Sequence, residues 1–183
     1  MVRFAKVTAG SMTRQVLLEA APQGWWYTAR LPNDRIVSMV VTEKDMLPFL
    51  QKKDQRGFEE AIGITTFIGK KLSSLSISDK SYHTWPIFSG ILSQIEGANW
   101  MAIGDAASSY DPIAAQGIHK ALTDGIRCQD TVASFFQGSD YDSNAFSNFV
   151  HQRYAVYQQN RAYSYLPEQR WAHPSFWRKR HSV

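Results

Sequence analysis

Residues 100–122 combine the residue types that a cofactor site needs. The apolar run Trp100-Met-Ala-Ile103 stops at Gly104-Asp105, a loop of small residues follows, and a helical pattern begins at Gln116-Gly117. Glycine lets the backbone approach a flat ligand because it has no Cβ. The first turn of a helix offers N–H groups and a positive dipole to an anion, and a carboxylate accepts hydrogen bonds from sugar hydroxyls. The spacing therefore predicts a buried strand, a loop and a helix that bind a nucleotide-like cofactor whose ring system becomes negative.

The same segment resembles the second FAD-binding motif of flavin-dependent monooxygenases, in particular their tryptophan-halogenase-like and geranylgeranyl-reductase-like branches. The matching residues are Gly104-Asp105-Ala106-Ala107, Asp111-Pro112 and Gln116-Gly117-Ile118. The resemblance implies that FAD is the cofactor and that Asp105 binds its ribose. It also implies contacts to the N1–C2 edge of the isoalloxazine. Those contacts come from Pro112, Gln116, Gly117 and Ile118, and Gly104 and Ala106 complete the expected cofactor site.

Two further segments resemble the same family. Gly24-Trp25-Trp26-Tyr27, followed by Leu31-Pro32, is similar to a strand of its substrate-binding sheet. The ending, residues 165–180, is similar to that of flavoproteins that oxidise peptides during quinone-cofactor maturation. The resemblance implies a small-molecule or peptide substrate lined by Trp25 and Tyr27. His119, just inside the predicted helix, faces either that substrate or solvent.

The pyrophosphate-binding element of this class is missing from the sequence. Flavoproteins of the class begin with a strand, Gly-x-Gly-x-x-Gly and a helix, yet no Gly-x-Gly occurs in the 183 residues. The resemblance therefore covers the C-terminal half of such a protein, with the N-terminal Rossmann half absent. It implies an N-terminal-half flavoprotein partner or self-association, and no residue is assigned a catalytic role.

The expected reaction type depends on how residues 25–29 differ from the halogenase motif. Flavin halogenases carry Trp-x-Trp-x-Ile-Pro where this chain has residues 25–29, and here Tyr27 replaces the second tryptophan. We therefore expect a flavin-dependent oxidoreductase, of monooxygenase type, once the chain is complemented. A halogenase fragment and a non-catalytic peptide- or partner-binding module remain as alternatives.

The strands and helices that the sequence predicts around these residues indicate an α+β fold. Strand propensity and Pro-Asn-Asp turn chemistry predict antiparallel sheet over residues 14–42, with another strand within 72–85. Helices are predicted over 43–50, 55–62, 117–136 and 143–165. We expect a partial substrate-binding region over residues 1–98. Residues 99–140 would form the C-terminal piece of an FAD-binding domain like that of p-hydroxybenzoate hydroxylase, and residues 141–183 a helical tail.

Composition excludes several classes of protein. With 44% hydrophobic and 13% aromatic residues, the chain can bury a core and is not intrinsically disordered. One cysteine, Cys128, excludes a disulfide scaffold and fits a reducing compartment. Neither a signal peptide nor a membrane-spanning run is visible, and the histidines lack metal-ligand spacing. We therefore expect a cytoplasmic protein without a metal site or membrane association.

The positive charge is confined to the end of the chain. Of the formal net charge of +4, residues 151–183 carry +5 and residues 1–150 carry −1. Aromatic residues are interleaved with these basic residues, which could stack on a nucleic acid. A helix that lays its aromatic side chains on the body, with its arginines in solvent, explains the pattern better. We therefore expect no nucleic-acid partner.

Overall fold

The computed structural model describes residues 1–46, 54–137, 144–171 and 173–181. It contains two compact units, residues 1–85 with 168–183 and residues 86–167. The C-terminal residues group with the first unit because the indole N–H of Trp177 donates to the Ala21 carbonyl oxygen at 2.9 Å. Within the described residues, no helix has the length and apolar character needed to cross a bilayer.

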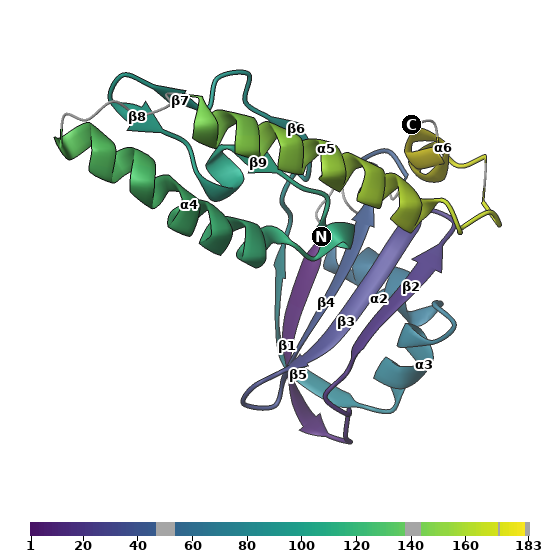
Figure 1. Cartoon of the computed structure of the whole chain (residues 1–183). Helices are drawn as coiled ribbons and strands as arrows, with labels where there is room; N and C mark the ends of the chain where they lie inside the picture. The colour runs from purple at the N-terminus through teal and green to yellow at the C-terminus, as the bar shows by residue number, and fades with distance from the viewer. Residues whose placement is uncertain (47–53, 138–143, 172, 182–183) are drawn as a thin grey trace. The chain divides into compact units, whose positions relative to one another are not determined.

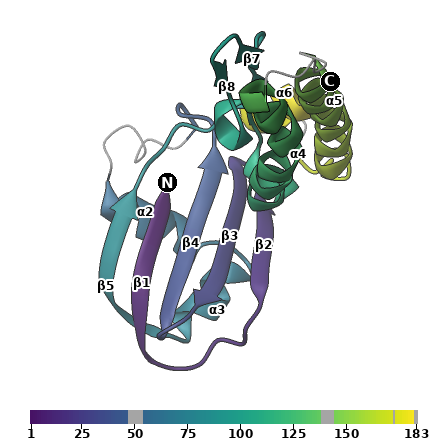
Figure 2. The same ribbon diagram turned by 60° about the vertical axis from the view of Figure 1, so that its left-hand side comes forward.

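The first unit is built on a five-stranded antiparallel sheet in the order β2-β3-β4-β1-β5, seen face-on in Figure 2. Its strands are β1 (Val2–Ala9), β2 (Val16–Ala21), β3 (Gly24–Leu31), β4 (Arg35–Thr42) and β5 (Ser76–His83). At the predicted Pro-Asn-Asp turn, Asn33 and Asp34 both have positive φ, and the Arg35 N–H bonds to the Pro32 carbonyl oxygen at 3.4 Å. This primed turn matches the twist of the two strands that it joins. The predicted antiparallel sheet is confirmed.

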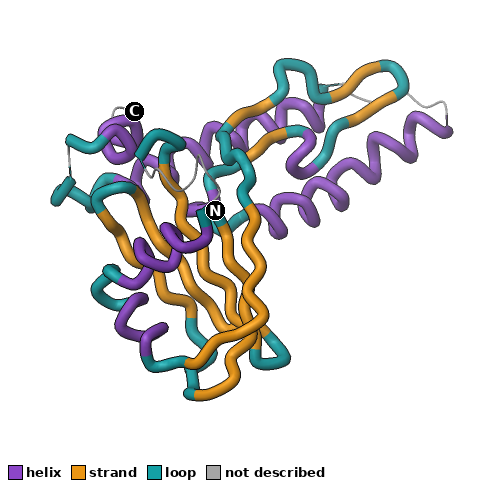
Figure 3. The backbone as a smooth tube through the Cα atoms, turned by 180° about the vertical axis from the view of Figure 1, so that it is seen from behind, coloured by secondary structure: helices purple, strands orange, loops and turns teal. Residues whose placement is uncertain are grey.

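Two helices, α2 (Gln55–Gly63) and α3 (Ile68–Ser73), cover one face of this sheet (Figures 1 and 3). α2 begins where the Asp54 side chain accepts a hydrogen bond from the Arg56 N–H. Trp26, from β3, which lies between β2 and β4, packs edge-to-face on Phe58 with ring centroids 5.3 Å apart. The core between sheet and helices also contains Ile36, Val40, Ile62, Ile68 and Leu72. Trp26 is therefore a core residue, and β-strand alternation directs Trp25 and Tyr27 to the opposite face.

The end of the chain forms α6 (Ser175–His181), in which Phe176 and Trp177 are buried. Arg180 stacks on the Phe176 ring at 3.6 Å and pairs with Glu43 at 2.9 Å. Glu43 also accepts from Lys179 at 3.1 Å. Burial would raise the pKa of Glu43, but the hydrogen bonds and charges of these two basic residues lower it. The prediction that tail aromatics pack on the body is confirmed for this helix, whereas the expectation of solvated arginines is wrong for Arg180.

The second unit contains two long helices, α4 (Gly117–Gln137) and α5 (Ala145–Tyr165), which run beside each other in Figure 1. Short elements precede them: β6 (Gly90–Ile91), β7 (Glu96–Gly97), β8 (Trp100–Met101), η1 (Gly104–Ala106), β9 (Ser108–Ser109) and η2 (Pro112–Ala114). The predicted buried strand at residues 100–103 is wrong. Only two of its residues pair, and Trp100 and Ile103 are exposed.

The helix predictions have mixed outcomes. The helices predicted over residues 55–62, 117–136 and 143–165 correspond to α2, α4 and α5. Half of the helix predicted over residues 43–50, namely residues 47–50, lies outside the described residues, and residues 44–46 form a turn instead of a helix. β1 and α3 were not predicted separately, because β1 contains the charged residues Arg3 and Lys6 and α3 is only six residues long.

Glu59 joins α2 to the sheet through three donors. It accepts hydrogen bonds from the buried Arg3, from Lys80 and from the Tyr82 hydroxyl, each at 2.8 Å. Burial acts to raise the pKa of Glu59, but these donors outweigh it and hold the pKa below its ordinary value. The ionised form therefore stabilises the folded unit at neutral pH, and this contribution is lost as the pH falls through the lowered pKa.

We expect Glu59→Gln to lower the free energy of unfolding at pH 7 by about 2 kcal/mol, because charged hydrogen bonds are lost and Arg3 stays buried. The difference from the unsubstituted chain should shrink below about pH 4.5, where the unfolded carboxyl takes up a proton. Urea unfolding at several pH values measures this. Glu60→Gln, on an exposed pair with Arg56, is the matched control and should change little. A Glu59→Gln deficit that is undiminished at pH 3 would contradict the prediction.

Candidate functional site

The Gly104 turn is the first part of the predicted cofactor segment. Gly104 has φ +59°, a conformation that glycine adopts without strain. A Cβ there would lie 3.4 Å from the Ala121 Cβ on α4. The Gly104 N–H donates to Asp124 Oδ2 at 2.8 Å. The turn is therefore held against α4, which follows it in sequence.

Asp124 is fully buried and forms a bidentate pair with Arg153 of α5. Burial would lower the pKa of Arg153, but the hydrogen bonds and charge of Asp124 raise it above its ordinary value. A buried carboxylate requires a partner of this kind, because removing it from water is costly. Asp124 thus connects the Gly104 turn, α4 and α5.

Asp105 lies at the surface of the turn, with its side chain 80% exposed. Its Oδ1 accepts a hydrogen bond at 2.7 Å from the Nζ of Lys120, a side chain that is 1% exposed. Lys120 Nζ also donates to the Ser108 carbonyl oxygen. Within the described residues Asp105 Oδ2 makes no hydrogen bond, so one carboxylate oxygen faces out, available to a ligand.

The loop between Asp111 and α4 is anchored from α5. Asp111 is buried and accepts from the Tyr165 hydroxyl at 2.9 and 3.1 Å and from Arg161 at 3.5 Å. Its Oδ1 also caps η2 through the Ile113 N–H at 3.1 Å. Ala115 then takes a left-handed conformation, φ +50°, and turns the chain into α4.

The first turn of α4 is open to a ligand. The Gln116 carbonyl oxygen accepts the Lys120 N–H at 2.8 Å, and the three preceding N–H groups have no acceptor within the helix. A Cβ built on Gly117 would meet no atom within 4 Å, and Ile118 and His119 are exposed. An anionic edge of a flat ring can approach this turn, so the residues present fit the isoalloxazine of FAD.

The predicted cofactor residues all belong to the second unit, within residues 104–118: Gly104, Asp105, Ala106, Pro112, Gln116, Gly117 and Ile118. Trp25 and Tyr27, predicted to line a substrate, lie on β3 of the first unit, where Trp25 is buried and Tyr27 is half-buried. Sequence reasoning missed Lys120 and Asp124. The sequence does contain an indication of both: they carry opposite charges, stand four residues apart, and lie on the helix face opposite the apolar residues Ile118, Leu122 and Ile126.

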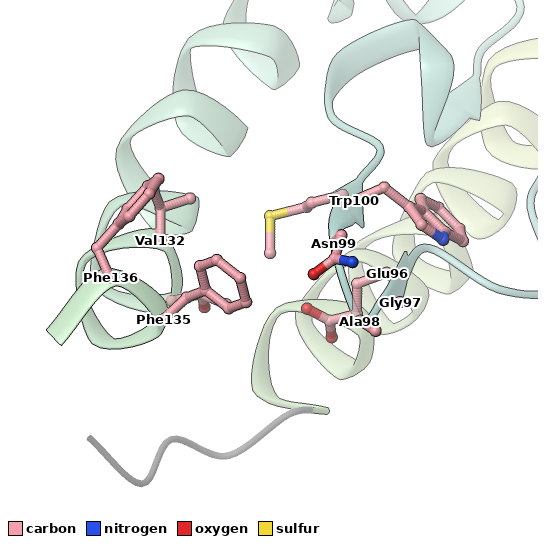
Figure 4. A pocket seen from close by; sticks show the side chains of 10 residues that line it. Glu96, Gly97, Ala98, Asn99, Trp100, Val132, Phe135 and Phe136 are labelled. Atoms are coloured by element: carbon pink, nitrogen blue, oxygen red, sulfur yellow. The ribbon is translucent and has the colours of Figure 1, made fainter. Parts of the chain in front are cut away.

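A separate apolar pocket of about 200 Å³ lies at the other end of α4 (Figure 4). The β7–β8 hairpin supplies one wall and Val132, Phe135 and Phe136 of α4 the other. None of the predicted cofactor residues lines it. Glu96 on its rim accepts the Ser147 N–H at 3.1 Å, within the first turn of α5.

Comparison with known proteins gives relatives of one kind. No protein-family model matches the sequence. LodB, an FAD-dependent oxidoreductase of Marinomonas mediterranea, is 24% identical over 165 residues, which cover 90% of this chain and 44% of LodB. The flavin-dependent halogenase armH1 of Armillaria mellea is 34% identical over 89 residues, or 49% of this chain and 15% of armH1. The chain spans less than half the length of these relatives.

Solved structures share the fold over the whole chain. The myxobacterial chondrochloren halogenase CndH matches with a TM-score of 0.77 and 15% identity, covering 100% of this chain and 44% of CndH. QhpG, a peptidyl tryptophan dihydroxylase essential for tryptophylquinone cofactor biogenesis, matches with a TM-score of 0.67 and 18% identity, covering 98% of this chain and 42% of QhpG. The resemblance expected from the sequence is confirmed. The relatives of this chain are flavin-dependent halogenases and an FAD-dependent oxidoreductase, and the chain corresponds to a partial region of these flavoproteins.

Proposed function

We propose that this chain is the C-terminal portion of a flavin-dependent oxidoreductase of monooxygenase type, and that it contributes ribose and isoalloxazine contacts to FAD. One observation carries the proposal: an exposed carboxylate, Asp105, and the open first turn of α4 at Gly117 belong to the same anchored segment. The FAD-dependent oxidoreductase and flavin-dependent halogenases among the relatives support FAD over another nucleotide.

Each part of the segment has a separate task in this proposal. Asp105 Oδ2 accepts a hydrogen bond from a ribose hydroxyl while Lys120 holds Oδ1. The N–H groups of Gly117 and Ile118 donate to the N1–C2 edge of the ring, where the helix dipole favours negative charge. Pro112 and Gln116 pack against the same edge. FAD, when bound, supplies the redox chemistry, and the protein orients it and excludes water.

The monooxygenase type is supported by Tyr27, which stands where flavin halogenases carry the second tryptophan of their motif. The similarity to armH1 favours halogenation as the second candidate. The substrate-lining role of Trp25, Tyr27 and His119 belongs to the same proposal. Trp25 is buried, so in this structure only Tyr27 and His119 have surface to offer a substrate.

The exposed face of α4 supports a complementing partner. Ile118, Leu122 and Ile126, spaced four residues apart, are 80%, 65% and 71% exposed. Regularly spaced apolar residues normally face a core, and exposed apolar patches mark interaction surfaces. The structural relatives CndH and QhpG contain more than half their length outside the matched region. We infer that this face packs against the remaining portion of the flavoprotein, on the same polypeptide or on a separate one.

FAD uptake tests the proposed function. The flavin fluorescence of FAD is titrated with this chain alone and with the chain mixed with the part of LodB outside the aligned 165 residues. Quenched fluorescence and a yellow protein in the mixture are expected. Association of the two portions without FAD uptake would instead support the non-catalytic partner-binding module, and no uptake under either condition would overturn the proposal.

Gly117→Ala separates folding from cofactor binding. The added Cβ meets open space in the chain itself, so the free energy of unfolding should rise by up to about 1 kcal/mol. FAD affinity in the mixture should fall about tenfold, because the methyl group keeps the ring from the backbone. Gly63→Ala, where a Cβ also meets nothing within 4 Å, is the matched control and should leave FAD affinity unchanged. Equal affinity of the two variants would contradict the isoalloxazine contact.

Ile126→Glu tests the partner surface. We expect the charged side chain to abolish association with the LodB portion, measured by analytical ultracentrifugation, because a buried unpaired carboxylate is costly. Val156→Glu, at a 54% exposed position of α5, is the control and should associate normally. Association of Ile126→Glu with undiminished affinity would exclude this face of α4 as the interface.

A further inference from the structure

Lys120 lies on the buried face of α4, where a charged side chain is rare. Its side chain is 1% exposed, whereas the neighbouring Ala121 and Leu122 are exposed. Its ammonium group contacts Asp105 Oδ1 at 2.7 Å and the Ser108 carbonyl oxygen, and lies 4.3 Å from the centroid of the Tyr110 ring. These contacts satisfy a buried cation, which would otherwise be strongly destabilising.

The ion pair of Lys120 with Asp105 is asymmetric. The cation is buried, but the carboxylate is 80% exposed. Exposed ion pairs contribute little to stability, and here the desolvated partner is the ammonium group. Stabilisation alone therefore does not account for a pair in which only the cation is buried. The hydrogen bond from the buried Lys120 to Oδ1 does fix the rotamer of Asp105, while Oδ2 remains at the surface.

The same helix face holds the rest of the turn. Asp124, one helical turn after Lys120, binds the Gly104 N–H at 2.8 Å, and Lys120 binds the Ser108 carbonyl oxygen. The backbone on both sides of Asp105 is thus fixed by two side chains of α4. Such preorganisation raises affinity, because less freedom is lost on binding.

We propose that Lys120 is a positioning residue that presents Asp105 Oδ2 to the ribose of FAD. The inference rests on the proposed function and deepens it: Lys120 does not touch the cofactor but acts through Asp105. Its contribution to FAD binding exists only while the Asp105 carboxylate is present. A residue with a merely structural role would weaken binding by the same factor with or without that carboxylate.

A double-mutant cycle tests this dependence. FAD affinity is measured in the mixture with the LodB portion for the unsubstituted chain, Lys120→Met, Asp105→Ala and the double variant. Methionine keeps the length and approximate volume of lysine. We expect Lys120→Met to weaken FAD binding about tenfold when Asp105 is present and less than about threefold in Asp105→Ala. Lys80→Met, which removes another ion-paired lysine, is the control and should not change FAD affinity.

A second measurement does not depend on FAD. Amide hydrogen exchange of residues 104–110 in the chain alone should be faster in Lys120→Met than in Lys80→Met, because the turn loses its anchor. Equal loss of FAD affinity in both Asp105 backgrounds, or no loss in either, overturns the positioning role. If the unsubstituted mixture takes up no FAD, the proposed function fails. Hydrogen exchange then decides whether Lys120 orders the turn, and unchanged exchange overturns that as well.

Discussion

The second unit depends on two buried charges on one face of α4. Lys120 and Asp124 lie one helical turn apart and are 1% and 0% exposed. Neither can be buried without partners, and the partners come from outside the helix: the Gly104 turn, the Asp105 carboxylate, the Ser108 carbonyl oxygen and Arg153 of α5. Electrostatics, rather than apolar contact alone, therefore sets where the turn and the two helices lie.

As a result, the apolar face of α4, formed by Ile118, Leu122 and Ile126, is exposed. One buried apolar cluster of the second unit has Ile95, Ala107, Phe146 and Val150 at its centre, and Tyr110, Tyr157 and Tyr165 of that unit are buried as well. In the first unit, by contrast, a larger core joins the sheet to α2 and α3. A helix with its charges inside and its aliphatic residues outside is stable as one layer of a larger assembly. That agrees with a chain that matches less than half the length of its relatives.

In the folded chain, many of the basic residues of the C-terminal segment, residues 151–183, form ion pairs within the protein. Among the described residues, several of its basic side chains pair with carboxylates: Arg153 with Asp124, Arg161 with Asp111, Arg170 with Glu168, and Lys179 and Arg180 with Glu43. Arg153 and Arg161 therefore help to anchor α5, and Lys179 and Arg180 help to anchor α6. Four aromatic side chains of the same segment are buried, as expected of amphipathic helices: Tyr157, Tyr165, Phe176 and Trp177.

The sequence alone predicted the antiparallel hairpin and the two long helices, and it identified residues 104–118 as the candidate cofactor segment, because β-branched runs, turn residues and a glycine motif are local signals. It could not decide which side of α4 is buried. The periodicity of Ile118, Leu122 and Ile126 predicts an inward apolar face, yet that face is exposed. Only the tertiary structure decided this, because the partners of Lys120 and Asp124 lie 12 to 29 residues away along the chain. The opposite charges of Lys120 and Asp124, four residues apart, are visible in the sequence, but the partners that make their burial possible are not, because pairing over such separations produces no local pattern.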